Sequence, residues 1–178
     1  MINSLKNTFP QIEQNSCLEF RIDKEFEIYD CDENDDNCTM GRCYVKENGQ
    51  FKVINHGPKE IAFLAVDKCL FFNNDGFKKC DCIIFEDSTI CFIEIKDCKN
   101  GQRAKRKKTA KEQLKSTLQI FKEAMDLERE HEAYLCVGVS STRPSTLSSS
   151  MDSIVEFEEK FDTRLFDGCQ KEFKLRPY

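Results

Sequence analysis

Residues 80–96 read CDCIIFEDSTICFIEIK, and this stretch decides the fold. Its two apolar runs flank residues 86–89, Glu-Asp-Ser-Thr, a sequence typical of a turn. If the runs pair so that position 86 faces position 89, Asp81 lies opposite Glu94. The alternation of side chains along a strand then places Lys96 on the same face as both carboxylates. The sequence predicts an antiparallel hairpin with three charged groups at one end.

These charges need an explanation, because both faces of the hairpin are otherwise apolar. Facing carboxylates destabilise a strand pair, and unpaired buried charges are costly. A divalent cation between Asp81 and Glu94 would compensate. An ion pair of either carboxylate with Lys96, at a partly exposed strand end, would also compensate. The two residue-level interpretations remain open at this point.

Outward from the hairpin, the pattern predicts one more strand on the N-terminal side and a helix followed by a strand on the C-terminal side. Residues 102–129 lack Pro and Gly and place Leu114, Leu118, Phe121 and Met125 at helical spacing. Residues 133–139, AYLCVGV, are typical of a buried strand. Upstream, residues 58–68 suit a helix that begins at a proline, and residues 68–72 and 77–85 suit two strands. The expected order over residues 58–139 is αβββαβ.

The flanking regions complete a single domain over residues 1–178. Residues 1–57 are predicted to form an acidic, β-rich extension, in which 43–55 read as a hairpin around Asn48-Gly49. The acidic loop DCDENDD is interpreted as solvated. Residues 140–178 are predicted to be a Ser-rich loop and a peripheral C-terminal segment. The expected fold class is α/β: an αβββαβ core, residues 58–139, with a mixed central sheet flanked by helices.

Composition indicates a globular protein that does not span a membrane. The 178 residues are 39% hydrophobic and 33% charged. No stretch has the length of an apolar membrane span, and the N-terminus lacks the apolar core of a signal peptide, so a cytoplasmic location is expected. The eleven cysteines are then expected to be free, and Cys69, Cys82, Cys91 and Cys136 to be small buried hydrophobes. The cysteines lack the closely spaced pairs that a zinc site requires, so zinc binding is a weak alternative.

Charge is distributed unevenly along the chain despite a net value of −5. Residues 1–40 hold ten carboxylates against three cations, whereas residues 96–115 hold nine cations against two carboxylates. The basic segment lies directly behind the charged hairpin end, where phosphates could approach. The candidate nucleic-acid-binding residues are Lys99, Arg103, Lys105, Arg106, Lys107, Lys108, Lys111 and Lys115.

The hairpin resembles the motif of the PD-(D/E)XK nucleases, an Asp on one strand followed by Glu-X-Lys on the next. The predicted αβββαβ order is similar to the core of that family, although Cys80 stands where the motif has Pro. The resemblance implies a Mg²⁺-dependent nuclease, with Mn²⁺ as a substitute. Its metal ligands would be Asp81, Glu94 and the Ile95 carbonyl, and Lys96 would orient or help to deprotonate the attacking water. DNA is favoured over RNA because most members of the family cleave DNA.

The same resemblance implies two further site residues. A carboxylate from the first helix joins the site in many members, and Glu60 is the candidate, with Asp67 second. A Gln from the second helix often faces the site, and Gln113 fits loosely. A surface position is the competing interpretation for each of these side chains.

Two other functions and two kinds of assembly are carried forward. The chain could be a nucleic-acid-binding module of the same fold, with weak or no catalysis, inside a larger assembly. A less favoured hypothesis is an acidic nucleic-acid mimic. The acidic N-terminal segment could engage a protein partner or shield the basic helix. A homodimer is a further assembly that the sequence leaves open.

Overall fold

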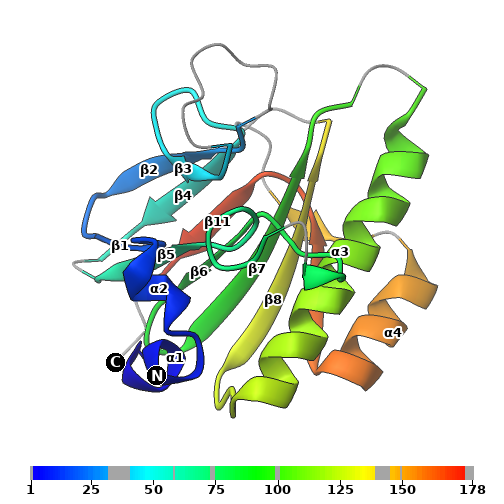
Figure 1. Ribbon diagram of the computed structural model, residues 1–178. Coiled ribbons are helices and arrows are strands. Elements are labelled where there is room, and N and C mark those ends of the chain that lie inside the picture. The colour runs from blue at the N-terminus through cyan, green and yellow to red at the C-terminus, as the bar shows by residue number, and fades with distance from the viewer. Residues whose placement is uncertain are drawn as a thin grey trace.

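The computed structural model describes residues 2–31, 41–57, 59–72, 75–98, 101–138, 145–148 and 150–174. The protein is a mixed α/β structure built on a seven-stranded sheet, accompanied by a separate four-stranded sheet (Figure 1). The large sheet has the order β1 (Leu18–Arg21), β5 (Ile61–Ala65), β6 (Cys82–Phe85), β7 (Thr89–Lys96), β8 (Glu130–Val137), β10 (Thr163–Asp167) and β9 (Thr146–Leu147). The small sheet has the order β11 (Gln170–Phe173), β4 (Phe51–Asn55), β2 (Glu25–Tyr29) and β3 (Tyr44–Val45). The helices are α1 (Ile2–Thr8), α2 (Gln11–Gln14), α3 (Arg103–Ala124) and α4 (Met151–Phe161).

The central hairpin has the register that the sequence predicts. Strands β6 and β7 are antiparallel, with Cys82 opposite Ile93 and Phe85 opposite Ile90. Every residue of β6 is buried, and so are the first seven of the eight residues of β7. The continuation of this register places Asp81, which immediately precedes β6, opposite Glu94. The hairpin is therefore the covered centre of the sheet.

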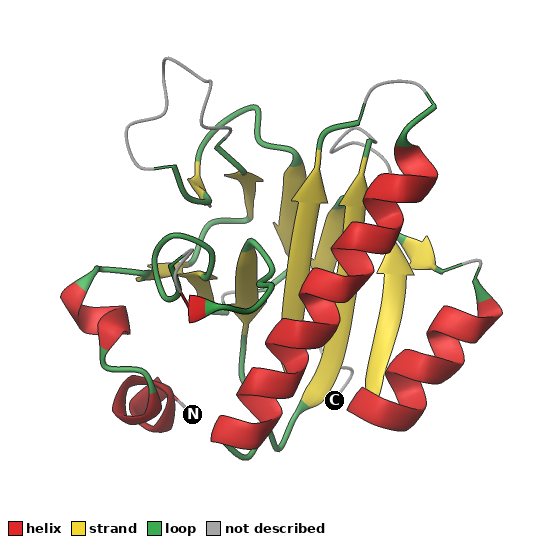
Figure 2. Ribbon diagram, turned by 45° about the vertical axis from the view of Figure 1, so that its right-hand side comes forward, coloured by secondary structure: helices red, strands yellow, loops and turns green. Residues whose placement is uncertain are grey.

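Helix α3 connects β7 to β8, which run parallel, and covers one face of the sheet (Figure 2). Its buried side chains include Ala110, Leu114, Leu118 and Phe121, at the spacing expected of one helical face. The Phe121 ring contacts the ring of Phe92 in β7, with centroids 5.7 Å apart. The predicted helix is thus confirmed, although it ends at Ala124 rather than at residue 129. The packing of α3 on the sheet thus holds the basic segment, at the start of the helix, near the end of the hairpin.

The small sheet is joined to the large sheet through β8. The ring of Phe51 in β4 meets the ring of Tyr134 in β8 edge-on, with centroids 5.4 Å apart. The Lys171 ammonium in β11 forms an ion pair with the Glu132 carboxylate in β8 at 2.5 Å. The predicted N-terminal β-rich extension therefore supplies β1 to the large sheet and β2, β3 and β4 to a second sheet. That second sheet takes its parallel strand β11 from the C-terminal part of the chain.

The expectation of a helix over residues 58–68 is wrong. Residues Ile61–Ala65 form β5, which pairs with β1 on one side and with β6 on the other. All five of its residues are buried, and a short continuous apolar run suits a central strand better than a helix with one wet face. The strand expected at residues 68–72 is a turn. Helices do precede the three antiparallel strands, but they are α1 and α2.

Two further expectations require correction. Strands β3 and β4 do not pair with each other around Asn48-Gly49, because β2 lies between them and pairs with both. The segment after residue 150 is not peripheral, since β10 lies inside the large sheet, parallel to β8. Most of the DCDENDD loop and residues 140–144 of the Ser-rich loop lie outside the described residues.

The cysteines only partly follow the expectation of free thiols. Disulfides link Cys17 to Cys69 and Cys136 to Cys169, so the expectation is wrong for these four. The free cysteines among the described residues are Cys43, Cys80, Cys82, Cys91 and Cys98. Disulfides persist mainly in oxidising compartments. The cytoplasmic location therefore stays a prediction, and these two links weigh against it. No helix in the described ranges is long and apolar enough to cross a membrane.

Candidate active site

Asp81 is held at the start of β6 by two polar side chains of α3. Thr117 Oγ1 accepts a hydrogen bond from the Cys80 backbone N–H at 2.7 Å. Gln113 Nε2 donates to the Lys79 carbonyl at 2.8 Å. Gln113 therefore anchors the chain that leads into Asp81 and does not line the cavity beside it. Its role in this structure is that of a positioning residue.

The Asp81 carboxylate crosses to the neighbouring strand. Its Oδ2 accepts a hydrogen bond from the Ile95 backbone N–H at 2.6 Å, and its Oδ1 lies 3.7 Å from the Lys96 ammonium. The N–H and C=O of a strand residue face the same edge, so the Ile95 carbonyl also faces the Asp81 side of β7. The structure brings these three predicted site residues together.

Glu94 is the most completely buried charged residue of the site. It has no exposed surface, and its Oε1 lies 2.5 Å from the Lys96 ammonium. Among the described residues, no donor forms a hydrogen bond of good geometry with either carboxylate oxygen of Glu94. A buried carboxylate normally accepts several hydrogen bonds, so this side chain lacks the partners that a purely structural role requires. The one cation beside it, Lys96, is shared with Asp81.

A cavity of about 300 Å³ opens above these residues. Asp81, Ile95 and Lys96 form part of its wall, whereas Glu94 lies behind Lys96. The remaining wall comes from the segments after β2, before β3 and before β4, from the segments after β5 and β7, and from α3. These wall residues include Asp30, Gln50, Asp67, Lys68, Asp97 and Arg106. The lining residues thus place the cavity where the large sheet, the small sheet and the start of α3 meet.

Burial and mutual repulsion disfavour the charged forms of the carboxylates. Burial, reinforced by the Asp30 charge, raises the pKa of Asp81 to about 8. Burial and then the Asp81 charge raise the pKa of Glu94 well above its ordinary value. Burial also raises the pKa of Asp67 and of Asp30. A cation placed among these carboxylates would stabilise the charged form of each one.

The Lys96 ammonium responds in the opposite direction. Burial alone would lower its pKa, but the Asp81 and Glu94 carboxylates outweigh burial and raise the pKa above its ordinary value. Lys96 is therefore protonated at neutral pH in this arrangement. It acts as a hydrogen-bond donor and a positive charge, and it is not a free base.

The donor set fits a hard divalent cation. In the described part of the chain, no three His, Cys, Asp or Glu side chains converge closely enough to hold an ion as they stand. Asp81 and Ile95 nevertheless line one cavity, and the buried Glu94 carboxylate lies next to them on the other side of the Lys96 ammonium. Carboxylate and carbonyl oxygens suit Mg²⁺, which retains several of its waters. The Glu94 carboxylate, buried and without a hydrogen bond, is the observation that supports the fit.

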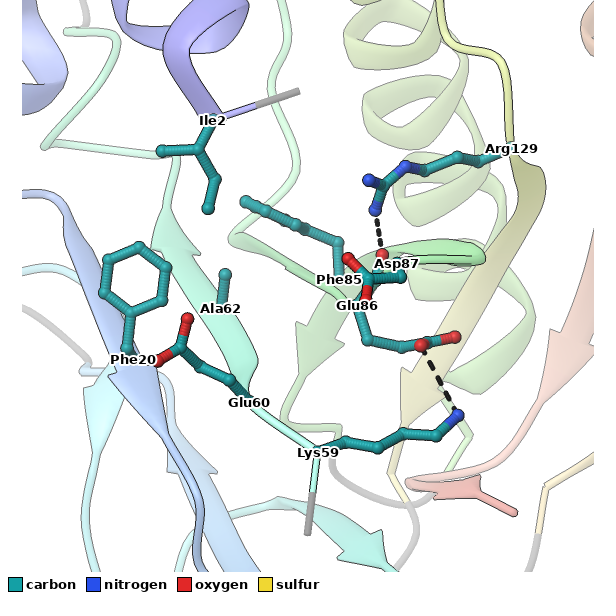
Figure 3. A pocket seen from close by; sticks show the side chains of 9 residues that line it. All are labelled: Ile2, Phe20, Lys59, Glu60, Ala62, Phe85, Glu86, Asp87 and Arg129. Carbon is teal, nitrogen blue, oxygen red and sulfur yellow. Dashed lines mark hydrogen bonds and ion pairs between the residues drawn. The ribbon is translucent and has the colours of Figure 1, made fainter. Parts of the chain in front are cut away.

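Glu60 does not belong to this site. It precedes β5 at the opposite end of the sheet and lines a separate cavity of about 440 Å³ (Figure 3). Its neighbours there include Phe20, Phe85 and Arg129. The sequence assigned Glu60 through a first helix that is in fact a strand. Asp67, the second candidate, does line the site cavity, from the turn after β5.

The basic segment divides into paired and exposed side chains. Lys107 pairs with Asp167 at 2.8 Å, Lys111 donates to Ser153 Oγ at 2.6 Å, and Lys115 pairs with Glu156. These three lysines join α3 to α4 and β10. The exposed cations are Arg103, Lys105, Arg106 and Lys108, and of these Arg106 lines the cavity. Lys99 lies outside the described residues.

The sequence missed Asp30, Gln50 and Lys68 as cavity residues. Asp30 stands at the start of the acidic loop, which the charge pattern assigned to solvent. Gln50 holds it in place, because its Oε1 accepts a hydrogen bond from the Asp30 N–H at 2.8 Å. The only sequence signal was the position of Asp30 directly after an alternating strand. Its burial depends on the small sheet, which local patterns do not reveal.

Comparisons with models of protein families, with curated proteins and with solved structures find no match for this chain. The arrangement of its own residues is therefore the basis for inferring a function.

Proposed function

We propose that this protein is a metal-dependent nuclease of the PD-(D/E)XK type, hydrolysing phosphodiester bonds at the Asp81–Glu94–Lys96 site. One observation carries the proposal: Glu94 is fully buried, no hydrogen bond of good geometry reaches its carboxylate among the described residues, and it shares the Lys96 ammonium with Asp81, a second buried carboxylate that lines an open cavity. A buried pair of this kind is costly for stability, so a chemical role is the better explanation.

Each residue then has a defined task. Asp81, Glu94 and the Ile95 carbonyl would hold Mg²⁺, or Mn²⁺ in its place, and the Ile95 N–H fixes the orientation of Asp81 through a hydrogen bond of 2.6 Å. When bound, the metal lowers the pKa of a water molecule and neutralises the charge that builds on the phosphate. Lys96 donates hydrogen bonds to that water or to a phosphate oxygen and so orients the attack. Asp67 and Asp30 lie close enough to influence the charge of the same cavity.

The nucleic acid approaches along the start of α3. Arg106 is exposed and lines the cavity, and Arg103, Lys105 and Lys108 are exposed on the same part of the helix. Contacts of cations with phosphates are insensitive to base sequence and weaken as salt rises. DNA is the proposed substrate because the resemblance in sequence favours it.

The test is cleavage of plasmid DNA, single-stranded DNA and RNA in Mg²⁺ or Mn²⁺, with and without EDTA. We expect cleavage that EDTA stops and that Asp81→Asn and Lys96→Gln each reduce by about a thousand-fold. Glu60→Gln is the matched control, because that carboxylate lies at the opposite end of the sheet, and it should leave the rate unchanged. Full activity in Asp81→Asn would exclude the proposed site.

One observation favours a second function, a binding module without catalysis. The Lys96 ammonium, 2.5 Å from Glu94, already supplies a positive charge to the carboxylates. If Lys96 occupies that position permanently, the protein binds nucleic acid in a salt-sensitive manner and leaves it intact. Isothermal titration with Mg²⁺ separates the two functions, because only the nuclease requires metal binding that is lost in Glu94→Gln.

A further inference from the structure

Strand β1 forms one edge of the large sheet (Figure 1). It exposes apolar side chains at this edge. Phe20 in β1 is 43% exposed, and Ile22, immediately after the strand, is 73% exposed. Leu18 is partly buried, and all three side chains lie on one face because alternate residues of a strand share a face. Figure 3 shows Phe20 at the wall of the cavity that also contains Ile2 and Glu60. An edge of this kind is a template for pairing with another strand.

The backbone groups available at this edge can be identified from the ladder between β1 and β5. The Cys17 carbonyl accepts a hydrogen bond from the Ala65 N–H at 2.9 Å, so Cys17 directs its polar groups towards β5. In an antiparallel ladder this direction alternates along the strand. The N–H and C=O groups of Leu18, Phe20 and Ile22 therefore point away from β5, towards the open edge.

The sequence of this edge is complementary to itself. Residues 18–22 read Leu-Glu-Phe-Arg-Ile. If two copies pair antiparallel about a two-fold axis at Phe20, each Glu19 faces Arg21 of the other copy, and each Leu18 faces Ile22. Opposite charges then oppose each other on one face, and apolar side chains meet on the other. The residues that exchange backbone hydrogen bonds are those whose polar groups point outward.

Neighbouring registers fail on charge. A shift of the partner by two residues in one direction places Glu19 opposite Glu19, and the opposite shift places Arg21 opposite Arg21. Like charges directly opposite each other destabilise a strand pair. Odd shifts fail because they direct inward-pointing backbone groups at the partner. In the described part of the chain, Arg21 already pairs with Asp23 at 2.8 Å, whereas the exposed Glu19 carboxylate has no cation beside it.

We propose that this protein forms a two-fold homodimer by antiparallel pairing of β1 with β1 of a second copy. The two seven-stranded sheets become one continuous sheet, and Phe20 of each copy packs against its counterpart at the axis. The pairing covers an edge that would otherwise be open to unspecific association. This interface is independent of the proposed nuclease site, because β1 is separated from β7 by two strands.

Sedimentation equilibrium on the full chain tests the dimer through a charge swap. The wild type should have twice the monomer mass of 20.8 kDa. Glu19→Arg alone and Arg21→Glu alone each place like charges opposite each other twice per dimer, and each should weaken dimerisation at least ten-fold. The double variant Glu19→Arg/Arg21→Glu should restore it, because the charges are exchanged but remain complementary. An equimolar mixture of the two single variants should form a heterodimer.

Circular dichroism shows whether each variant keeps its fold, which we expect because Glu19 and Arg21 reach the surface. A dissociation constant on the order of 100 μM is the weakest dimer affinity that is relevant here. A wild type that remains monomeric at that concentration would therefore overturn the proposal. A dimer that both single variants leave intact would overturn it as well, because the subunits would then meet at another surface. Restoration in the double variant and in the mixture supports the stated register.

Discussion

Glu94 and Glu132 are buried carboxylates on neighbouring strands, each with a Lys ammonium 2.5 Å away, but they differ in their other partners. Glu132 in β8 is 4% exposed and accepts hydrogen bonds from Tyr134, Arg164 and Lys171, the last at 2.5 Å. Burial raises the pKa of Glu132, but the Lys171 ammonium and its other partners outweigh burial and lower the pKa below its ordinary value. Glu94 in β7 has no hydrogen bond among the described residues, and burial raises its pKa.

The difference separates a charge that the fold stabilises from one that the proposed function would explain. Glu132 joins three strands, β8, β10 and β11, and its charged form is stabilised by the folded protein. Glu94 shares one cation with Asp81 and contributes no comparable link. A site that binds a metal needs carboxylates whose oxygen atoms are not already committed to the protein. Burial of a charge alone would not distinguish the two residues, whereas their hydrogen bonds do.

The largest expected effect is on activity, in Glu94→Gln. If the proposed function is correct, cleavage should fall roughly a thousand-fold, about 4 kcal/mol of transition-state stabilisation, because the site would lose a metal ligand. The free energy of unfolding should stay the same or rise, because the folded protein does not stabilise the charged form of Glu94. Cleavage assays and urea denaturation of the same preparation measure both quantities. A large loss of stability would place Glu94 in the same structural class as Glu132.

Glu132→Gln should have the opposite effects: a loss of stability and no loss of activity. Removal of this charge leaves Lys171 and Arg164 without their carboxylate, and breaking a buried pair typically costs about 3 kcal/mol of unfolding free energy. Cleavage per folded molecule should remain near that of the wild type, because Glu132 faces the small sheet and not the site cavity. Denaturation curves measured in urea provide the stability, and assays below the transition provide the rate.

The pH dependence of stability should also differ in sign between the two regions. The pKa of Asp81 is about 8 in the folded protein and near 4 when unfolded, so the folded state binds the proton more tightly. Without metal, stability should therefore fall as the pH rises from 4 to 8, by at least about 1.4 kcal/mol relative to Asp81→Asn. The lowered pKa of Glu132 contributes stability above its unfolded pKa, and that contribution is lost as the pH falls. Thermal unfolding of both proteins in EDTA, at several pH values, measures the difference. Parallel curves for wild type and Asp81→Asn would contradict the assignment.

The hairpin was predictable because its signals are local. Turn residues between two apolar runs fixed the register, and this register placed Asp81, Glu94 and Lys96 together. Helix α3 was predictable for the same reason, since one segment carries its whole apolar face. A local signal is not always sufficient, because the equally local turn signal at Asn48-Gly49 predicted a pairing of β3 with β4 that β2 prevents.

The remainder depends on contacts between distant segments. Strand β5 reads as an amphipathic helix until β1 and β6 pair with its two edges in the centre of a sheet, where all five of its residues are buried. The sequence around Asp30 is typical of a solvated loop, but the small sheet places this residue at the cavity. That sheet includes β11, which comes from the other end of the chain. The prediction of Glu60 failed with the helix that was expected to carry it. Nothing in the sequence marked Glu132 as the structural counterpart of Glu94, because its partners come from two later strands.

The smallest effects are expected from substitution of two adjacent cations on α3. One of these cations is exposed and the other is paired with a carboxylate, a contrast that parallels the comparison of Glu94 with Glu132. Arg106 is exposed at the cavity, whereas Lys107 is paired with Asp167 at 2.8 Å. Arg106→Gln should weaken binding to a DNA oligonucleotide by about 3- to 10-fold and reduce the salt dependence of the affinity by about one phosphate contact. Lys107→Gln should instead lower the free energy of unfolding by roughly 0.5–1 kcal/mol, because its pair is partly exposed, and leave the salt dependence unchanged. Fluorescence anisotropy over a salt series compares the two, and equal losses of affinity would show that the whole basic face meets the nucleic acid, paired lysines included.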